Sequence, residues 1–165
     1  MFYEGVFREL NRRGVRYVVI GGVAVNLHGV PRTTADLDLL VDLQGPNLQK
    51  LIEAMKNLGY RPRAPVRFAD ITLENLRTWV KEKHMRVLSF TNPERPQEEV
   101  DILVNSPVSF EEVYGRIEFV TAKGLSIPLI SLDDLITLKR RSGRLQDLSD
   151  VEALRKVKKI KEGLK

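Results

Sequence analysis

The sequence predicts an α+β fold, with a mixed or antiparallel sheet flanked by helices and further helices at the C-terminal end. Three observations support this prediction. Apolar residues recur at helical spacing in some segments and at strand spacing in others. The two kinds of segment follow one another without a strict βαβ repeat, and two pairs of strands are joined by turns short enough for hairpins. The order therefore argues against a Rossmann fold.

Local signals place the elements along the chain. The expected strands are short β-branched runs, and Lys123-Gly124 marks a hairpin turn. Pro46 lies near the first turn of one helix, and Ser131 opens another with an acid three residues later. The expected elements are helices over residues 2–13, 23–29, 46–58, 71–82, 109–116, 131–143 and 145–163, strands over 16–20, 35–42, 85–92 and 98–105, and a second hairpin over 117–130.

Length and composition predict one soluble domain. The chain has 165 residues, with an expected core over about residues 15–130 and a helical part over about 131–165. No apolar run approaches the roughly 20 residues of a membrane span, and the N-terminus does not have the pattern of a signal peptide. The absence of cysteine excludes disulfides, thiolate metal sites and cysteine nucleophiles. We therefore expect a cytoplasmic protein without a membrane partner.

The charge balance favours a phosphate-bearing partner. The formal net charge is +5 and the isoelectric point is about 9.6. Residues 155–165 contain six basic residues and one acid. A solvated final helix and tail explain that run better than a binding surface does, so the run by itself does not identify such a surface.

Two aspartates one residue apart are the first candidate functional residues. Asp36 and Asp38 lie in an apolar strand, where residues two apart project to the same face at roughly 6–7 Å. Two ionised carboxylates at that distance repel each other unless a cation lies between them. Asp101 begins a second apolar strand, and three such acids could hold two Mg²⁺ ions for phosphoryl or nucleotidyl transfer. The alternative is the polar face of a half-exposed sheet.

A pair of glycines precedes these acids. Gly21 and Gly22 end the first strand just before a helix, and thirteen residues separate Gly22 from Asp36. Glycine lets a ligand come close to the backbone, and a helix N-terminus offers free N–H groups to an anion. A Gly-Gly pair is often only a turn, but here one strand-turn-helix unit would place a phosphate cradle beside the acids.

Together these residues resemble the DNA polymerase β-type nucleotidyltransferase superfamily. The matching elements are Ile20-Gly21-Gly22, Asp36-Leu37-Asp38-Leu39 and Asp101. Residues 24–41 and 135–154 are also similar to small prokaryotic nucleotidyltransferases of the type IV toxin–antitoxin kind, the AbiEii-like toxins. The resemblance covers about residues 15–157, and it implies the nucleotidyltransferase fold.

The resemblance also implies an activity and site roles. It implies a magnesium-dependent enzyme that moves a nucleoside monophosphate from a triphosphate to a hydroxyl of an RNA or protein acceptor. In this interpretation two Mg²⁺ ions bind to the catalytic residues Asp36, Asp38 and Asp101. The nucleotide-binding candidates are Gly21, Gly22, Arg32 and Lys139, with Arg144 a weaker candidate.

The candidate residues other than the three aspartates also have purely structural explanations. Arg32 could be a solvated loop arginine, and Lys139 could simply suit a helix C-terminus. His28 at a helix end fits a structural role at least as well as a functional one. Asp147 and Asp150 could orient the cations or only occupy the first turn of the last helix.

A binding module is the competing interpretation of the whole chain. The same fold could serve as the antitoxin or regulatory half of a toxin–antitoxin pair that acts mainly through a partner protein. The sequence does not distinguish ATP from CTP, GTP or UTP, because base selection depends on pocket side chains that no motif fixes here. It also does not identify the acceptor.

Overall fold

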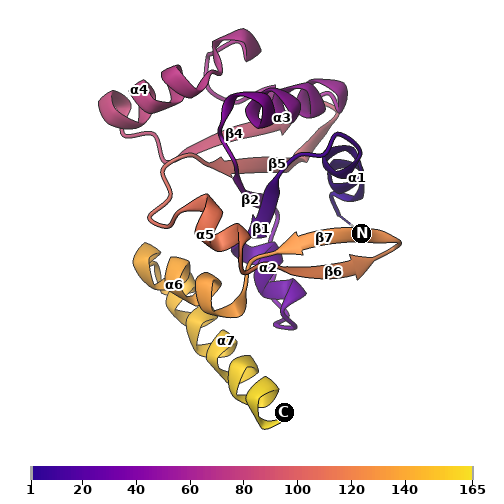
Figure 1. Ribbon diagram of the computed structural model, residues 1–165, viewed down its shortest axis with the longest axis vertical. Coiled ribbons are helices and arrows are strands. Elements are labelled where there is room, and N and C mark those ends of the chain that lie inside the picture. The colour runs from indigo at the N-terminus through magenta and orange to yellow at the C-terminus, as the bar shows by residue number, and fades with distance from the viewer. Residues whose placement is uncertain (1, 165) are drawn as a thin grey trace.

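The computed structural model describes residues 2–164 and confirms the α+β class. Its centre is one mixed seven-stranded sheet of order β3-β4-β5-β2-β1-β7-β6 (Figure 1). The elements are α1 (Glu4–Arg12), β1 (Tyr17–Ile20), α2 (Gly21–Leu27), β2 (Leu37–Val41), α3 (Gly45–Asn57), β3 (Arg61–Pro62), the 3-10 turn η1 (Phe68–Asp70), α4 (Leu73–Lys83), β4 (Val87–Asn92), β5 (Arg95–Leu103), α5 (Phe110–Tyr114), β6 (Glu118–Ala122), β7 (Leu125–Leu129), α6 (Leu132–Ser142) and α7 (Leu145–Gly163).

The pairing at the middle of the sheet aligns two of the predicted acids. Strand β2 runs antiparallel to β1 and parallel to β5. In this register Asp38 lies opposite Ile20 on one side and opposite Asp101 on the other. Residues directly opposite each other point to the same face, so the two carboxylates are cross-strand neighbours.

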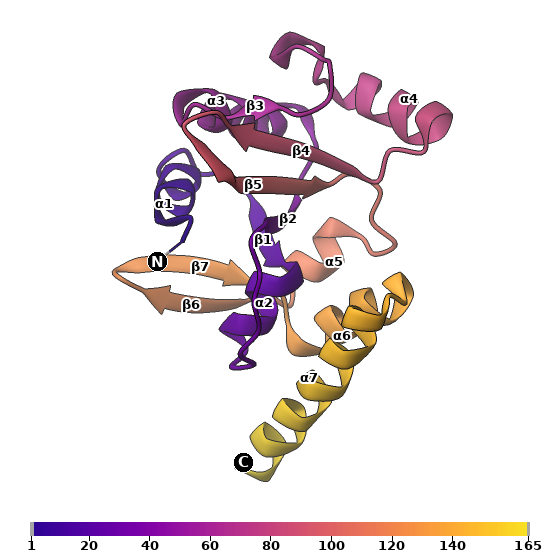
Figure 2. The same cartoon turned by 180° about the vertical axis from the view of Figure 1, so that it is seen from behind.

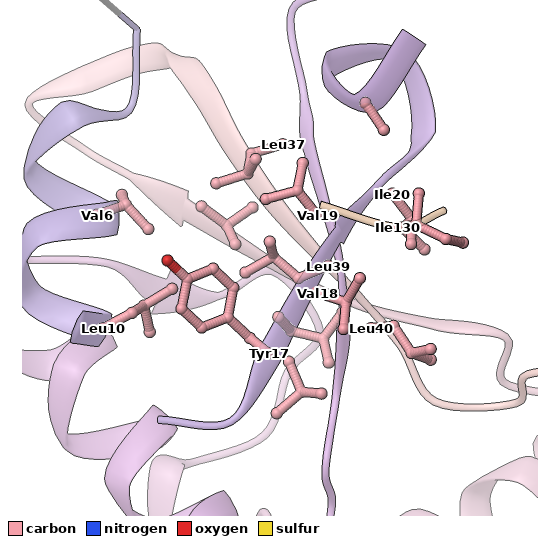
Figure 3. Packing of buried hydrophobic residues seen from close by; sticks show 14 of the residues in the cluster. Val6, Leu10, Tyr17, Val18, Val19, Ile20, Leu37, Leu39, Leu40 and Ile130 are labelled. Carbon is pink, nitrogen blue, oxygen red and sulfur yellow. The ribbon is translucent and has the colours of Figure 1, made fainter. Parts of the chain in front are cut away.

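The face of the sheet that does not carry the acids packs against α1 and α3. Val6 and Leu10 of α1 face Tyr17 and Leu39 across this interface (Figure 3). Leu10 and Leu39 are completely buried. Burying an aliphatic side chain of this size stabilises a fold by about 1.5–3 kcal/mol, so this layer gives β1 and β2 a fixed base.

The opposite face is covered in part by α2 and by the C-terminal helices. Figures 1 and 2 show α2 beside β1, and α6 packed on α7 with the end of α7 projecting away from the sheet. Leu132 and Leu135 of α6 and Leu154 of α7 belong to the same buried cluster as β1. The division into a core and a C-terminal helical part stays a prediction. Within residues 2–164, no helix is long and apolar enough to cross a membrane.

The expected elements occur in the expected order, but several boundaries were wrong. Helix α2 begins at Gly21 instead of residue 23, so the glycines form its first turn. Strand β2 begins at Leu37, which leaves Asp36 in the extended segment before it. Strand β5 begins at Arg95, three residues before the expected start, because it continues the hairpin with β4. Strand β3 and η1 were not predicted.

Two local predictions are confirmed in detail. Lys123 and Gly124 both have positive φ, 49° and 75°, which is the turn geometry that suits a two-residue hairpin. At the start of α6, the Ser131 hydroxyl accepts a hydrogen bond from the Asp134 amide at 3.2 Å. This bond satisfies one of the free N–H groups of the helix N-terminus and fixes where α6 begins. The position of Lys139 two turns later follows from it.

Candidate active site

Asp38 and Asp101 lie in a cleft of about 670 Å³ between the sheet and the C-terminal helices. Strands β1, β2 and β5 form one wall, and α6 with the start of α7 forms the other. The volume is within the range of small-molecule sites. The polar residues that line the cleft are Asp38, Arg86, Asp101, Asn105, Lys139, Arg141, Ser142, Arg144 and Asp147.

Burial and neighbouring acids disfavour the charged forms of Asp38 and Asp101. Burial first, then the charge of Asp101, then that of Asp36, raises the pKa of Asp38 to about 7. Burial also raises the pKa of Asp101, and the charges of Glu99 and Asp36 raise it further. One oxygen of Asp101, Oδ1, is buried and makes no hydrogen bond within the described chain. A buried carboxylate oxygen without a partner is costly and indicates a group suited to a ligand.

The charges of Lys139 and Arg144 lower the pKa of Asp38 only in part, because other carboxylates hold both side chains. The Lys139 ammonium, almost fully buried, lies 3.1 Å from Asp147 Oδ1 and 2.9 Å from Asp150 Oδ2. Arg144 Nε lies 2.9 Å from Asp147 Oδ2, and Arg32 pairs with Asp150. Asp147 and Asp150 therefore orient all three cations, and they do more than place negative charge in the first turn of α7.

The protonation of Asp147 reflects these contacts. Burial by itself would raise the pKa of this carboxyl. Hydrogen bonds from Ser142, Arg144 and Lys139 outweigh burial, so the pKa is lowered and the group is ionised at neutral pH. An ionised Asp147 holds the Lys139 side chain at the wall of the cleft opposite Asp38.

Gly21 is required by the close approach of Asp38. A Cβ atom added to Gly21 would lie 2.1 Å from Asp38 Oδ2, which no packing arrangement permits. Gly21 also has a φ of +69°, a conformation that non-glycine residues rarely adopt. At Gly22 an added Cβ would lie 2.6 Å from Thr34 Oγ1 and 3.3 Å from Arg32 Cζ. The two glycines let the segment before β2 fold closely over the start of α2.

We expect Gly21→Ala to displace the Asp38 carboxyl and to lower any activity of the cleft by at least about 100-fold, because about 1 Å of misplacement has that effect. The left-handed φ adds about 1–2 kcal/mol of destabilisation. Gly14→Ala is the matched control, since Gly14 has a φ of +66° and nothing within 4 Å of an added Cβ. It should show the conformational destabilisation and full activity. Equal activity of the two variants would contradict this explanation of Gly21.

His28 has a structural position. Its Nε2 lies 2.8 Å from the Ile130 carbonyl oxygen, so Nε2 carries the proton and donates it. Burial lowers the pKa of His28, and the ring is neutral at pH 7. The side chain joins the end of α2 to the segment after β7 and does not line the cleft.

The structure brings together some of the predicted site residues and not others. Gly21, Asp38, Asp101 and Lys139 line the cleft. Asp36 is half-buried one residue before β2, and its charge raises the pKa of both other acids, but it does not line the cleft. Among residues 2–164, no three acidic or histidine side chains converge as a group that could hold a metal ion. The side chain of Arg32 pairs with Asp150, and an added Cβ at Gly22 would meet Thr34; neither Gly22 nor Arg32 lines the cleft.

Sequence reasoning missed two cations at the cleft. Arg86 precedes β4, and pairing of Val87 with Leu103 on β5 brings it to the cleft. Arg141 near the end of α6 donates a hydrogen bond to the Pro107 carbonyl at 2.9 Å. Neither arginine belongs to a motif. The strand register brings Arg86 to the cleft, and the position of α6 brings Arg141 there. For Arg141 the one sequence signal was the basic run of residues 139–144.

A second hollow of about 460 Å³ lies on the same face of the sheet, where β2 and β5 end. Leu40 and Leu103, each two residues beyond one of the acids, form part of its floor. Leu73 and Val80 of α4 and Phe110 of α5 contribute to its sides. Leu103 lines both hollows, so the second one adjoins the acid cleft.

A family model described as nucleotidyltransferase of unknown function (DUF6036) matches residues 6–162. The chain belongs to this family. The nucleotidyltransferase assignment that the acids and glycines suggested is thus confirmed at the level of the superfamily. A search of the curated proteins gave no match.

Solved structures of nucleotidyltransferases share the fold. The lincosamide antibiotic adenylyltransferase LnuA, determined with lincomycin bound, has a TM-score of 0.58 at 19% identity, over 92% of this chain and 93% of its own. ANT(2")-Ia in complex with adenylyl-2"-tobramycin has a TM-score of 0.58 at 14% identity, over 96% and 92%. A nucleotidyltransferase from Thermotoga maritima has a TM-score of 0.53 at 17% identity, over 92% and 86%.

Proposed function

We propose that this nucleotidyltransferase moves a nucleoside monophosphate from a nucleoside triphosphate to an acceptor hydroxyl, with divalent metal ions held by Asp36, Asp38 and Asp101. One observation carries the proposal. The pKa of each of the three carboxyl groups is raised, mainly by burial, and the charges of Asp101 and Asp36 add to the shift of Asp38 beside a cleft whose Lys139 and Arg144 are already paired. Such an arrangement destabilises the folded protein by itself, and a bound cation would remove the cost.

The donor atoms suit magnesium, and because the three carboxyl groups do not converge within residues 2–164, the ion would have to draw them together. All three donors are carboxylates, which hard divalent cations prefer, and Asp101 Oδ1 is buried without a partner. When bound, Mg²⁺ would neutralise phosphate charge and polarise the reacting phosphoryl group. Asp36, Asp38 and Asp101 would hold it, and Gly21 leaves room for Asp38 to do so.

In the proposed reaction the chain's own residues position the reactants. The Asp101 carboxylate accepts the proton of the acceptor hydroxyl, whose oxygen forms a bond to the α-phosphorus. The bond from that phosphorus to the bridging oxygen breaks, and pyrophosphate leaves with the electron pair. Lys139 and Arg144, held by Asp147, face the cleft and would bind the phosphate oxygens. Gly21 and Gly22 would offer backbone N–H groups to the same phosphates.

Two acceptor classes are supported by different features. Arg86 and Arg141 add positive charge at the cleft, and this favours an RNA over a protein acceptor. The second hollow, walled mainly by apolar side chains, favours a small hydroxylated molecule, and two of the similar structures are antibiotic adenylyltransferases. We propose the RNA acceptor first, because cations border the cleft that contains the acids.

The first experiment is calorimetry of ATP, CTP, GTP and UTP, each with and without Mg²⁺. The wild type is compared with an Asp36→Asn, Asp38→Asn double variant and with Asp133→Asn, whose acid is exposed on α6 at 72% of its side chain. We expect one triphosphate to bind only with Mg²⁺, and only the double variant to lose it. The nucleotide identified in this way then serves as the label in an acceptor assay.

The acceptor assay uses two further variants. Loss of labelling in an Arg86→Ala, Arg141→Ala variant would support RNA, and loss in Val80→Trp, which fills the second hollow, would support a small molecule. If no triphosphate binds the wild type, the free-standing enzyme is ruled out. We would then propose the alternative function, a regulatory module of a toxin–antitoxin pair that acts through a partner protein. The similarity to AbiEii-like toxins suggested this alternative.

A further inference from the structure

One buried tyrosine hydroxyl joins the two segments that carry the acids. The Tyr3 side chain belongs to the residue that precedes α1, and only 5% of the residue is exposed. Its hydroxyl donates a hydrogen bond to the Ala35 carbonyl and accepts one from the Glu99 amide at 3.1 Å. Ala35 directly precedes Asp36, and Glu99 lies two residues before Asp101.

These bonds begin where the strand pairing stops. The parallel pairing of β2 with β5 starts at Leu37 opposite Val100. Before that point, the Ala35 carbonyl and the Glu99 amide are bridged through the Tyr3 hydroxyl and not bonded to each other. The Tyr3 hydroxyl thus connects the backbones of the two segments just beyond the last strand pair, at the end where Asp36 lies.

The backbone of Tyr3 indicates that this contact is strongly determined. Tyr3 has a φ of 63° and a ψ of 15°, the left-handed conformation, which costs a non-glycine residue about 1–2 kcal/mol. Such a conformation persists only where surrounding contacts fix it. The Tyr3 carbonyl accepts the first helical bond of α1, from the Phe7 amide at 3.0 Å, so the packed helix fixes the base of the side chain.

We propose that Tyr3 is a positioning residue that holds the Asp36 segment against β5, so that Asp36 stands beside Asp38 and Asp101 when a divalent cation binds. The inference rests on the proposed function, because it assigns Tyr3 a role at the same acids. Tyr3 touches no substrate and no acid directly. It acts through the backbone of Ala35 and Glu99, as groups behind metal ligands commonly do.

The test compares Tyr3→Phe with the wild type and with Tyr17→Phe. Tyr17 is a matched control, since it is buried on β1 and its hydroxyl bonds to Asn11 Oδ1 at 2.8 Å and to no other residue from 2 to 164. Binding of Mn²⁺ alone is measured by calorimetry, and exchange of the Glu99 amide hydrogen is measured by NMR. We expect Tyr3→Phe to weaken Mn²⁺ binding roughly tenfold and to speed Glu99 exchange, with Tyr17→Phe unchanged in both.

The outcomes separate this inference from the proposed function. If the wild type binds Mn²⁺ and Tyr3→Phe binds it equally well, the positioning role is wrong, even if the variant unfolds at a lower temperature. An unchanged exchange rate at Glu99 would also overturn it, because the bridge would then not hold the strand. If the wild type binds neither Mn²⁺ nor a triphosphate with Mg²⁺, the proposed function fails first, and the role of Tyr3 fails with it.

Discussion

Asp38→Asn is expected to abolish nucleotidyl transfer and, in metal-free solution, to stabilise the fold. Loss of the charge removes a proposed metal ligand, so transfer should fall on the order of 10³-fold or more. Asparagine resembles the protonated acid in shape but never ionises, so it removes the repulsion from Asp101 and Asp36. Replacement of a residue that only supports the structure lowers the stability of the protein. An increase in stability on replacement instead indicates a residue that serves a ligand.

The stabilising effect should depend on pH in a defined direction. The pKa of Asp38 is raised from 3.8 to about 7 in the folded protein. Between these pH values the unfolded chain has lost the proton and the folded chain still holds it, so wild-type stability falls as the pH rises from about 4 to about 7. The stability of Asp38→Asn should not show this fall, because asparagine does not ionise. In EDTA it should match the wild type near pH 4 and exceed it by roughly 4 kcal/mol at pH 8.

Glu9→Gln is the matched control with the opposite sign. Hydrogen bonds from Arg12 and Arg13 lower the pKa of Glu9 to about 2, far from the cleft on α1. Its charged form stabilises the fold above the unfolded pKa, so the variant should lose stability at pH 7, regain equality at strongly acid pH, and keep full transfer activity. Denaturant unfolding at pH 4, 6 and 8 measures the Asp38→Asn series, and a further measurement near pH 2 tests the recovery of Glu9→Gln. Destabilisation by Asp38→Asn at pH 8 would show that the carboxylate has a partner in the fold.

The sequence was informative where chemistry follows from local spacing. Asp38 and Asp101 could be identified because each lies in an apolar strand, where an acid needs a special reason. The glycine pair could be identified because it ends a strand before a helix. Its exact role could not, since glycine disfavours helices and the pair suggested a turn before α2. The contact between Gly21 and the Asp38 carboxyl exists only once β1 and β2 are paired.

What sequence reasoning missed depends on contacts between distant parts of the chain. Arg32 was expected either to bind phosphate or to be a solvated loop residue, but it pairs with Asp150, 118 positions away. Tyr3 bridges residues 35 and 99, and no local pattern marks a tyrosine whose hydroxyl reaches another strand. Arg86 needs the β4–β5 register to reach the cleft. Spacing predicts which faces are apolar, whereas such pairings depend on how the sheet and helices assemble.

Lys139→Met is expected to cause the largest loss of stability among single charge changes in the cleft. Methionine keeps the length of the side chain but removes the cation that contacts Asp147 at 3.1 Å and Asp150 at 2.9 Å. Both acids are nearly fully buried, and removal of one partner from a buried ion pair typically costs about 3–5 kcal/mol. Ser142 and Arg144 remain on Asp147, and Arg32 remains on Asp150, so we expect about 3 kcal/mol at pH 7.

The pH dependence and a surface control make this prediction specific to the buried network. The pKa of Asp147 is lowered in the fold, so its contribution is present above the unfolded pKa of about 4 and is lost as the pH falls further. The deficit of Lys139→Met should therefore shrink below pH 4. Lys158→Met breaks an exposed pair with Asp133 at 2.8 Å and should change stability by less than about 0.5 kcal/mol.

Urea unfolding of Lys139→Met and Lys158→Met gives the comparison. Equally small effects of the two variants would mean that Arg32 and Arg144 alone neutralise Asp147 and Asp150. In that case Lys139 would be free to serve the triphosphate, and its variant should still lose triphosphate affinity.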